Sequence, residues 1–271
     1  LPVFYRPEMV AESGSFSPSA GKPRLAVESW QALGVPLDIR SFDPVTREQI
    51  KRAHDPVFVN DLLDCRLENG FGNRRADVAA SLPYTSGSML AAAQEALRNG
   101  VGAVSPTSGF HHAGYAHASG FCSLNGLMVT AMTLPDLCIG ILDFDMHYGD
   151  GTNDIIVQLD QHQRVIHFTQ GGQRRVSGGA FLYSIPDILK RFAGCDVVLY
   201  QAGGDPAIGD PLGNWLTVEQ LAKRDALVFS GLRRMGVPVA WNLAGGYQSP
   251  FEKVLRIHDN TMLAAAKFWL S

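Results

Sequence analysis

The feature that most constrains the fold is the stretch IGILDFDMHYGDG at 139–151, an apolar run that ends in acidic and histidine side chains. In an extended strand, residues two apart point to the same face. Asp143, Asp145 and His147 are therefore expected to converge, while the two residues between them face the other way. This spacing predicts a metal site at the end of a strand.

Three other apolar runs also stop at polar groups. The run 101–109 leads to His111 and His112, 195–204 leads to Asp205, and 237–246 leads to Tyr247. Helical stretches separate these runs, and this alternation is typical of a mostly parallel α/β sheet with buried strands. Ligands bind beyond the carboxyl ends of the strands in such sheets. We therefore expect the four strand ends to contribute to one site.

Composition favours a single domain spanning 1–271. The 271 residues are 46% hydrophobic, enough for one large core, and no linker of Pro, Gly and Ser divides them. The net charge is −3 and the basic residues are scattered, so direct nucleic-acid binding is not expected. A homo-oligomer is compatible with this composition.

The cysteines and the absence of long apolar stretches predict a cytoplasmic protein without membrane association. No run approaches 18 apolar residues, and the first residues do not resemble a signal peptide. The four cysteines lack the spacing of a zinc motif and are expected to be reduced, buried and inert; they are Cys65, Cys122, Cys138 and Cys195.

Capping patterns predict where several helices begin. Thr46 with Gln49 and Thr217 with Gln220 fit the capping box, and a proline follows both Asp55 and Ser249. The expected helices are 47–53, 56–67, 88–100 with Ser88 as its cap, 218–235 and 250–269, with a further amphipathic helix around Val27, Trp30 and Leu33.

Ligand chemistry assigns roles to the polar groups at the strand ends. Asp145, His147 and Asp205 are the natural ligands of a divalent ion, because two carboxylates and one imidazole leave a coordination position open. Asp143 and Asp150 are better placed to orient neighbouring histidines.

Proton transfer is expected from the adjacent His111 and His112. Tyr247 follows two glycines that permit a sharp bend and could donate a hydrogen bond to an oxyanion. Taken singly, a His-His pair is more often a structural pair and a Gly-Gly-Tyr segment is more often a simple turn. Their combination with the acidic strand end favours hydrolysis of an amide or ester by metal-activated water.

Four segments resemble the histone deacetylase superfamily, which includes acetylpolyamine amidohydrolases. They are GFHHAGYAHASGFCSLNG (109–126), ILDFDMHYGDGTND (141–154), QAGGDPAIGDPLG (201–213) and LAGGY (243–247). Weaker similarity extends through 53–63 and 84–93. The resemblance implies a single-domain, three-layer arginase/deacetylase fold with a sheet of about eight strands, and a zinc-dependent hydrolase that removes acetyl or other acyl groups from amines such as acetyl-lysine or acetylpolyamines.

The resemblance also implies a role for each matching residue. Asp145, His147 and Asp205 correspond to zinc ligands; Fe²⁺ or Co²⁺ could take the same ligands. His112, held by Asp150, corresponds to the general base and acid, and His111, held by Asp143, to its electrostatic partner. Tyr247 corresponds to the phenol that polarises the carbonyl, and Gly120 and Phe121 line the substrate channel. A K⁺ ion is expected near the Asp143 strand, next to Thr169.

One departure and two alternatives accompany this interpretation. Tyr148 stands where the family commonly has a second histidine. The first alternative is a catalytically silent binding protein on the same scaffold. The second is a two-metal ureohydrolase of the arginase type, which the motif containing His147 disfavours.

Overall fold

Seven parallel strands form one sheet in the computed structural model, which describes residues 1–270. Their order across the sheet is β2-β1-β3-β7-β6-β4-β5, and every neighbouring pair is parallel. The strands are β1 (Pro2–Phe4), β2 (Asp38–Arg40), β3 (Gly102–Val104), β4 (Ile139–Asp143), β5 (Val165–Thr169), β6 (Val197–Gln201) and β7 (Val239–Asn242). The predicted parallel α/β sheet is confirmed, with seven strands where about eight were expected.

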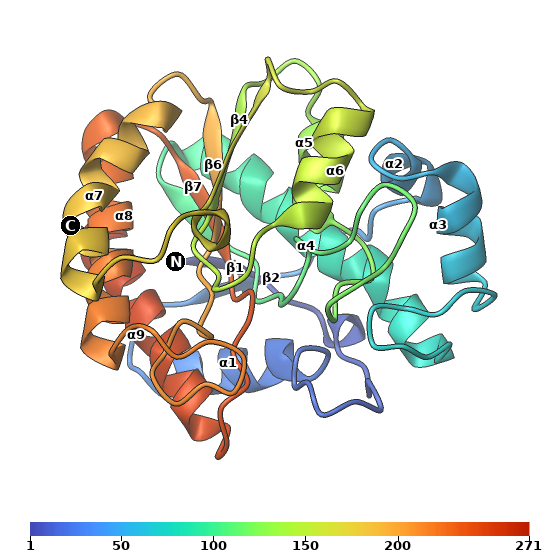
Figure 1. Ribbon diagram of the computed structural model, residues 1–271, viewed down its shortest axis with the longest axis horizontal. Helices are drawn as coiled ribbons and strands as arrows, with labels where there is room; N and C mark the ends of the chain where they lie inside the picture. The colour runs from blue at the N-terminus through green and yellow to red at the C-terminus, as the bar shows by residue number, and fades with distance from the viewer. Residues whose placement is uncertain (271) are drawn as a thin grey trace.

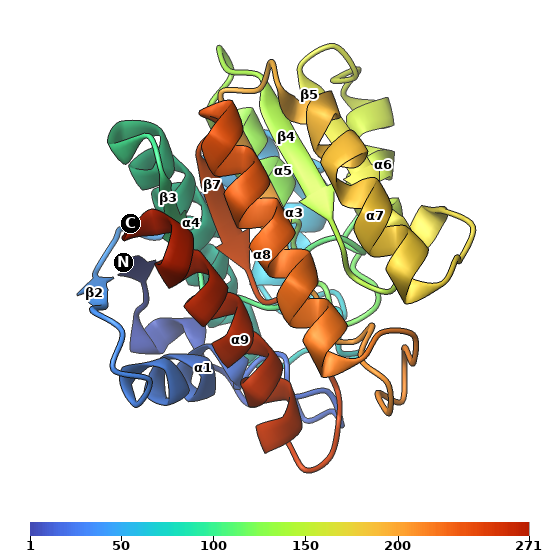
Figure 2. The ribbon, with the colours of Figure 1, turned by 90° about the vertical axis from the view of Figure 1, so that its left-hand side faces the viewer.

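Helices cover both faces of this sheet. Figure 1 shows α7, α8 and α9 on one side and α4, α5 and α6 on the other, and Figure 2 looks onto the face covered by α7, α8 and α9. The α-helices are α1 (Lys22–Gln31), α2 (Arg47–Lys51), α3 (Pro56–Leu63), α4 (Ala76–Asn99), α5 (Gly126–Thr133), α6 (Asp150–Gln158), α7 (Gly178–Leu189), α8 (Val218–Met235) and α9 (Glu252–Trp269). Short 3₁₀ helices are η1 (Pro7–Met9), η2 (Gln170–Gly172) and η3 (Lys190–Phe192). The arrangement has the three predicted layers.

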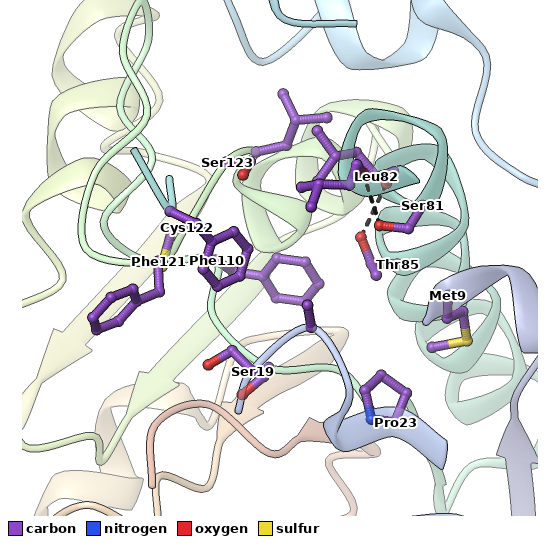
Figure 3. Close-up of a pocket in the computed structure, with 15 residues that line it drawn as sticks. Met9, Ser19, Pro23, Ser81, Leu82, Thr85, Phe110, Phe121, Cys122 and Ser123 are labelled. Carbon is purple, nitrogen blue, oxygen red and sulfur yellow. Dashed lines mark hydrogen bonds between the residues drawn. The ribbon is translucent and has the colours of Figure 1, made fainter. Parts of the chain in front are cut away.

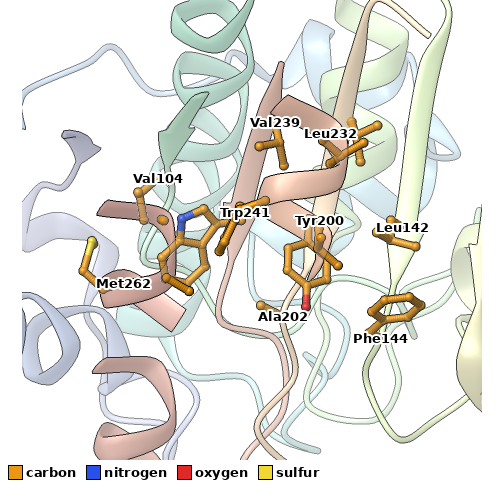
Figure 4. Close-up of a cluster of buried hydrophobic side chains, with 14 of the residues drawn as sticks. Val104, Leu142, Phe144, Tyr200, Ala202, Leu232, Val239, Trp241 and Met262 are labelled. Atoms are coloured by element: carbon orange, nitrogen blue, oxygen red, sulfur yellow. The ribbon is translucent and has the colours of Figure 1, made fainter. Parts of the chain in front are cut away.

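The strands are apolar throughout because both faces of the sheet are buried. On β6, Val198 and Tyr200 join the core beneath α8 and α9, whereas Val197 and Leu199 join the core on the α4 and α5 side. Figure 4 shows the first of these clusters, in which Trp241 of β7 and Tyr200 pack beside Leu232 of α8. Each fully buried side chain of this size contributes about 1.5–3 kcal/mol to folding. Burial on both faces therefore accounts for the continuous apolar runs in the sequence.

The expected helix starts are confirmed at three places. Thr46 and Thr217 each accept a hydrogen bond from the backbone N–H three residues later, which completes the capping boxes of α2 and α8. Asp55 caps α3 in the same way, with Pro56 at the first helical position. The ends differ slightly from expectation, since α2 ends at Lys51 and α3 at Leu63.

The long helix α4 corrects the predicted start at Ser88. It begins at Ala76, and Ser88 lies in its buried middle, where the hydroxyl donates to the Phe4 carbonyl over 2.6 Å. The sequence does not predict the first half of this helix, because Pro83 and Gly87 are poor helix formers. Gly87 is required by packing, since an added Cβ would lie 2.9 Å from the Asp43 carbonyl oxygen. Tertiary contacts therefore override local propensity here.

Helix α9 corrects a second start. Ser249 was expected to cap a helix beginning at Pro250, but α9 begins at Glu252 and Phe251 occupies the N-cap position. No side chain caps this end through a hydrogen bond. The preceding loop is held instead by Gln248, whose amide donates to the Ile208 carbonyl over 2.9 Å.

The four polar strand ends meet because β3, β7, β6 and β4 are neighbours in the sheet. Their parallel carboxyl ends open onto the same edge, as the sequence predicts. One detail differs from expectation: β4 ends at Asp143, so Asp145 and His147 lie in the following loop rather than on a strand. Loop contacts, not strand alternation, bring these side chains together.

Two further expectations concern the whole chain. Among residues 1–270, no helix combines the length and the apolarity needed to cross a membrane. The four cysteines form no disulfide. Cys122 and Cys195 are buried as expected, whereas Cys65 and Cys138 are only partly buried.

Candidate metal centre and active site

Asp145, His147 and Asp205 form a compact group of metal-ligating side chains. One ligand atom from each lies within 4.8 Å of the other two. Both carboxylates are buried, whereas the His147 side chain is 37% exposed and so gives the group an open side. His147 Nδ1 lies 3.2 Å from Asp145 Oδ1 and 3.0 Å from Asp205 Oδ2. The three residues predicted as ligands are thus brought together.

Backbone amides orient the two carboxylates. Asp145 accepts from the N–H groups of His147 over 3.0 Å and Gly245 over 2.8 Å, and Asp205 Oδ1 accepts from Met146 N–H over 3.1 Å. Gly245 is required here because an added Cβ would lie 2.6 Å from Asp205 Oδ2. The loops after β4, β6 and β7 are therefore in direct contact around the ligands.

The electrostatics of the group suit a divalent cation. Burial and the charge of Asp145 raise the pKa of Asp205 to about 7, and the close contact with both carboxylates raises the pKa of His147 to about 10, so negative charge is concentrated here. Asp205 Oδ2 is buried without a hydrogen bond of good geometry from the described residues. Two carboxylates and one imidazole match the ligand chemistry of zinc and related ions. These residues fit the metal implied by the sequence.

Two His–Asp pairs lie beside the ligand group. His111 Nδ1 is 2.7 Å from Asp143 Oδ2, His112 Nδ1 is 2.6 Å from Asp150 Oδ1, and the two imidazole ring centroids are 4.1 Å apart. Both histidines lie in the loop after β3. The Thr152 N–H donates to the His111 carbonyl over 3.0 Å, which fixes this loop against the first turn of α6. The predicted pairings are present.

The two histidines differ in charge because their surroundings differ. Burial opposes the charged form of His111, but Asp143 and Asp145 outweigh this effect and raise its pKa to about 9. Burial lowers the pKa of His112, and the neighbouring His111 lowers it further. One imidazole therefore favours the cationic form while the other favours the neutral form at pH 7.

Tyr247 reaches the site through the loop after β7. Its N–H donates to Asp210 Oδ2 over 2.7 Å, and Asp210 follows the ligand Asp205 in the loop after β6. Burial, with the nearby Asp145, raises the phenol pKa well above 10, so the hydroxyl stays protonated and can donate a hydrogen bond. The expected bend is present, although the left-handed positions are Ala244 (φ +50°) and Gly246 (φ +137°).

Gly120 lies against His112, and Phe121 lies beside Tyr247. An added Cβ at Gly120 would lie 2.5 Å from His112 Cδ2, so glycine permits this close approach. The ring centroid of Phe121 is 5.6 Å from that of Tyr247 and 5.3 Å from that of Phe16. Between the Phe121 segment and α4 lies a cavity of about 40 Å³, which Phe110 and Leu82 help to line (Figure 3).

Sequence reasoning missed several buried polar groups that support these loops. His54 contacts the Gly114 carbonyl through Nδ1 and accepts from the Asn125 N–H through Nε2, over 2.8 and 3.0 Å. Lys22 is fully buried and donates to the Ala244 carbonyl over 2.9 Å. Arg224 is fully buried on α8. No local pattern distinguishes a basic residue of this kind from a solvated one on a helix surface.

Comparison with known proteins identifies the family. Residues 22–173 match the histone deacetylase domain. An uncharacterized Picosynechococcus protein is 31% identical over 247 residues, which cover 79% of this chain and 80% of that protein. The chain belongs to the histone deacetylase family. The family that the sequence motifs predict is thereby confirmed.

Named members of the histone deacetylase family are more distant. Histone deacetylase 15 of Arabidopsis thaliana is 26% identical over 66% of this chain and 39% of its own length. The acetylpolyamine amidohydrolase of Mycoplana ramosa is 27% identical over 52% of this chain and 50% of its own length. The matches to these two named relatives therefore cover half of their length or less.

Solved structures confirm the fold of this family member. An acetylpolyamine aminohydrolase from Burkholderia pseudomallei superposes with a TM-score of 0.74 at 17% identity, covering 97% of this chain and 98% of that one. The HDA15 HD domain gives a TM-score of 0.78 at 20% identity, covering 100% and 91%. The arginase/deacetylase fold predicted from the sequence is therefore present.

Proposed function

We propose that this chain is a zinc-dependent amidohydrolase that removes an acetyl or similar acyl group from an acylated amine. The observation that carries the proposal is the position of the Asp145, His147 and Asp205 group beside two His–Asp pairs. Membership of the histone deacetylase family supports hydrolase chemistry. We further propose that 1–271 acts as one catalytic domain.

Asp145, His147 and Asp205 would hold the zinc ion in this proposal. A bound zinc ion supplies Lewis acidity to a carbonyl oxygen and lowers the pKa of water to about 7. Fe²⁺ and Co²⁺ suit the same donors. The 37% exposure of the His147 side chain supports access from the side where a substrate would enter.

His112 acts as the general base and then as the general acid. Contact between its Nδ1 and Asp150 leaves Nε2 free, and the lowered pKa keeps the ring neutral and able to accept a proton from the attacking water. As the carbon–oxygen bond forms and the carbon–nitrogen bond breaks, the same proton passes to the leaving amine. The products are a carboxylic acid and a free amine.

Tyr247 and His111 stabilise the charge that develops during this step. The protonated phenol of Tyr247 donates a hydrogen bond to the carbonyl oxygen as it becomes an oxyanion. His111, paired with Asp143, keeps its positive charge close to the ligand carboxylates, because its Nε2 lies 3.7 Å from Asp145 Oδ1. Each side chain therefore has a separate task.

The substrate enters along Gly120 and Phe121 in this proposal. The aromatic ring of Phe121 and the missing side chain of Gly120 support a narrow passage for an unbranched acylated amine. We also propose K⁺ near Asp143 and Thr169, which face each other across β4 and β5 in register. Thr169 Oγ1 already accepts from the Gly149 N–H over 3.1 Å.

The proposal is tested by the change Asp205→Ala, which removes one carboxylate from the predicted ligand group. We expect the variant to lose stoichiometric zinc and all zinc-dependent release of acetate, measured by metal analysis and product assay. Asp187→Ala, a change at an exposed acidic residue, serves as the matched control and should keep both. Full zinc content in the Asp205→Ala variant would show that the ligand set is wrong.

A catalytically silent binding protein is the alternative that this assay separates. It is less favoured because the chain keeps both His–Asp pairs and the tyrosine. A silent protein would bind the acylated amine but release no product.

A further inference from the structure

Arg224 lies directly behind the predicted metal ligands. It belongs to α8, which covers one face of the sheet (Figure 2), and its side chain is fully buried. Its guanidinium Nη1 donates to two backbone carbonyls, Phe144 over 3.1 Å and Gly203 over 2.8 Å. Phe144 immediately precedes the ligand Asp145, and Gly203 lies two residues before the ligand Asp205. One nitrogen atom thus joins the loops that carry both carboxylates.

A hydrogen-bond network holds Arg224 in this orientation. Its Nε donates to Asp225 Oδ1 over 2.8 Å, and the Tyr200 hydroxyl donates to the same oxygen over 2.5 Å. The second oxygen of Asp225 accepts from the Thr261 hydroxyl over 2.6 Å. These contacts connect β6, α8 and α9, so the guanidinium is fixed by rigid elements on the side away from the ligands. Arg224 can therefore hold the two loops at a defined separation.

The other hydrogen bonds between the two ligand loops lie on either side of the carbonyls that Arg224 binds. The Phe144 N–H donates to the Gln201 carbonyl over 3.1 Å, which continues the pairing of β4 with β6. Beyond that point the Met146 N–H reaches Asp205 itself over 3.1 Å. The carbonyls of Phe144 and Gly203 lie between these two contacts, and the positive guanidinium satisfies both.

We propose that Arg224 is a positioning residue that sets the separation of Asp145 and Asp205 and thereby the affinity of the metal site. This inference rests on the metal site of the proposed function. Partners that orient metal ligands typically change metal affinity by about 10-fold to 100-fold when they are removed.

The direction of the change in metal affinity distinguishes a positioning role from an effect of the positive charge alone. A buried cation near a metal site repels a divalent ion, so loss of its charge alone would strengthen metal binding. Loss of the carbonyl contacts would weaken metal binding, because the ligand loops could then move apart. Arg224→Gln removes the charge and shortens the side chain. Arg224→Lys keeps the charge but loses the planar guanidinium group. Positioning predicts weaker binding in both variants.

The buried ion pair requires a matched control. Removing Arg224 alone leaves Asp225 buried and unpaired, which is strongly destabilising. The double variant Arg224→Met with Asp225→Asn removes both charges, and Asp225→Asn alone disturbs the network but leaves the guanidinium contacts to Phe144 and Gly203. Both proteins lack the Asp225 carboxylate, so the comparison of the double variant with Asp225→Asn reports only on the guanidinium, through its charge and its contacts to the two carbonyls. Loss of the charge alone would tighten zinc binding, so weaker binding in the double variant reports loss of the contacts.

The experiment measures zinc dissociation constants by competition with a chelator, starting from metal-free protein whose folding is checked by circular dichroism. We expect the double variant to bind zinc about 10-fold or more weakly than Asp225→Asn, and Arg224→Lys to be weakened about as much relative to wild type. Equal or tighter binding in the double variant would overturn the inference. If the wild-type protein itself binds no zinc, the proposed function fails, and the inference fails with it.

Discussion

Among single residues, Tyr247 has the most specific predicted task. Its phenol is held protonated by burial beside Asp145, and its backbone is tied to Asp210. The backbone contact does not involve the hydroxyl, so removing the hydroxyl should leave the loop in place. A change at Tyr247 can therefore test the catalytic role of the hydroxyl without changing the loop.

We expect Tyr247→Phe to lower kcat for acetate release by about 10²-fold to 10³-fold, because an oxyanion donor is lost. Zinc content should be unchanged, since the phenol is not in the ligand group. Tyr148→Phe is the matched control: that side chain is 42% exposed beside the ligand His147 and should retain kcat. Steady-state kinetics of both variants check this, and undiminished kcat in Tyr247→Phe would remove the phenol from the mechanism.

Single residues of the site differ in how far the sequence predicts their roles. Asp145, His147 and Asp205 were predictable because their residue types carry metal chemistry and follow apolar strands. Arg224 was not, because its role depends on burial against two carbonyl oxygens that lie far away in the sequence. From the sequence alone, a charged residue such as Arg224 is expected on the solvent-exposed face of its helix, and only the packing of α8 shows that it is buried.

Among elements, the segment between α2 and α3 shows how one buried histidine joins three parts of the chain. His54 contacts the Gly114 carbonyl and the Asn125 N–H, so it links this segment to the loop after β3 and to the start of α5. Burial lowers its pKa to about 4. The unfolded chain has a histidine pKa near 6.5.

This difference predicts a pH-dependent stability. Above pH 6.5 His54 is neutral in both states and its native contacts are intact. As the pH falls from 6.5 towards 4, the unfolded chain binds a proton that the folded chain excludes, so the free energy of unfolding decreases, by about 3 kcal/mol in total. Denaturant unfolding of metal-free protein at pH 7.5 and 5 measures the decrease.

A variant assigns this pH dependence to His54. The free energy of unfolding should decrease between pH 7.5 and 5 in both proteins. We expect this decrease to be about 2 kcal/mol smaller in His54→Gln than in the wild type. His162→Gln, a change at an exposed histidine, is the matched control and should follow the wild type. Identical pH dependence in wild type and His54→Gln would contradict the buried neutral state of His54.

Helix boundaries show why elements were predicted unevenly. The starts of α2, α3 and α8 were predictable because each has a side-chain cap that acts within three residues. The start of α4 was not, since its interior holds Pro83 and Gly87, and the need for Gly87 comes from contact with Asp43. Side-chain caps therefore predict where a helix begins, whereas helix starts that depend on packing between distant segments cannot be predicted in this way.

For the whole molecule, topology explains why the sequence predicts the site. Four apolar runs separated by helices imply parallel strands, and parallel strands place their carboxyl ends on one edge. The strand order β3-β7-β6-β4 makes these four strands neighbours, which the sequence alone does not specify. The seven-stranded sheet and the family fold agree with the expected architecture.

The activity that we propose for this arrangement is zinc-dependent removal of an acyl group from an amine. The most direct test is acetate release from an acetyl-lysine peptide and from acetylated polyamines, using chelator-stripped protein with and without one equivalent of Zn²⁺. We expect turnover of at least one of these substrates only when zinc is restored. Zinc bound at one equivalent without any turnover of the panel would contradict the proposed activity.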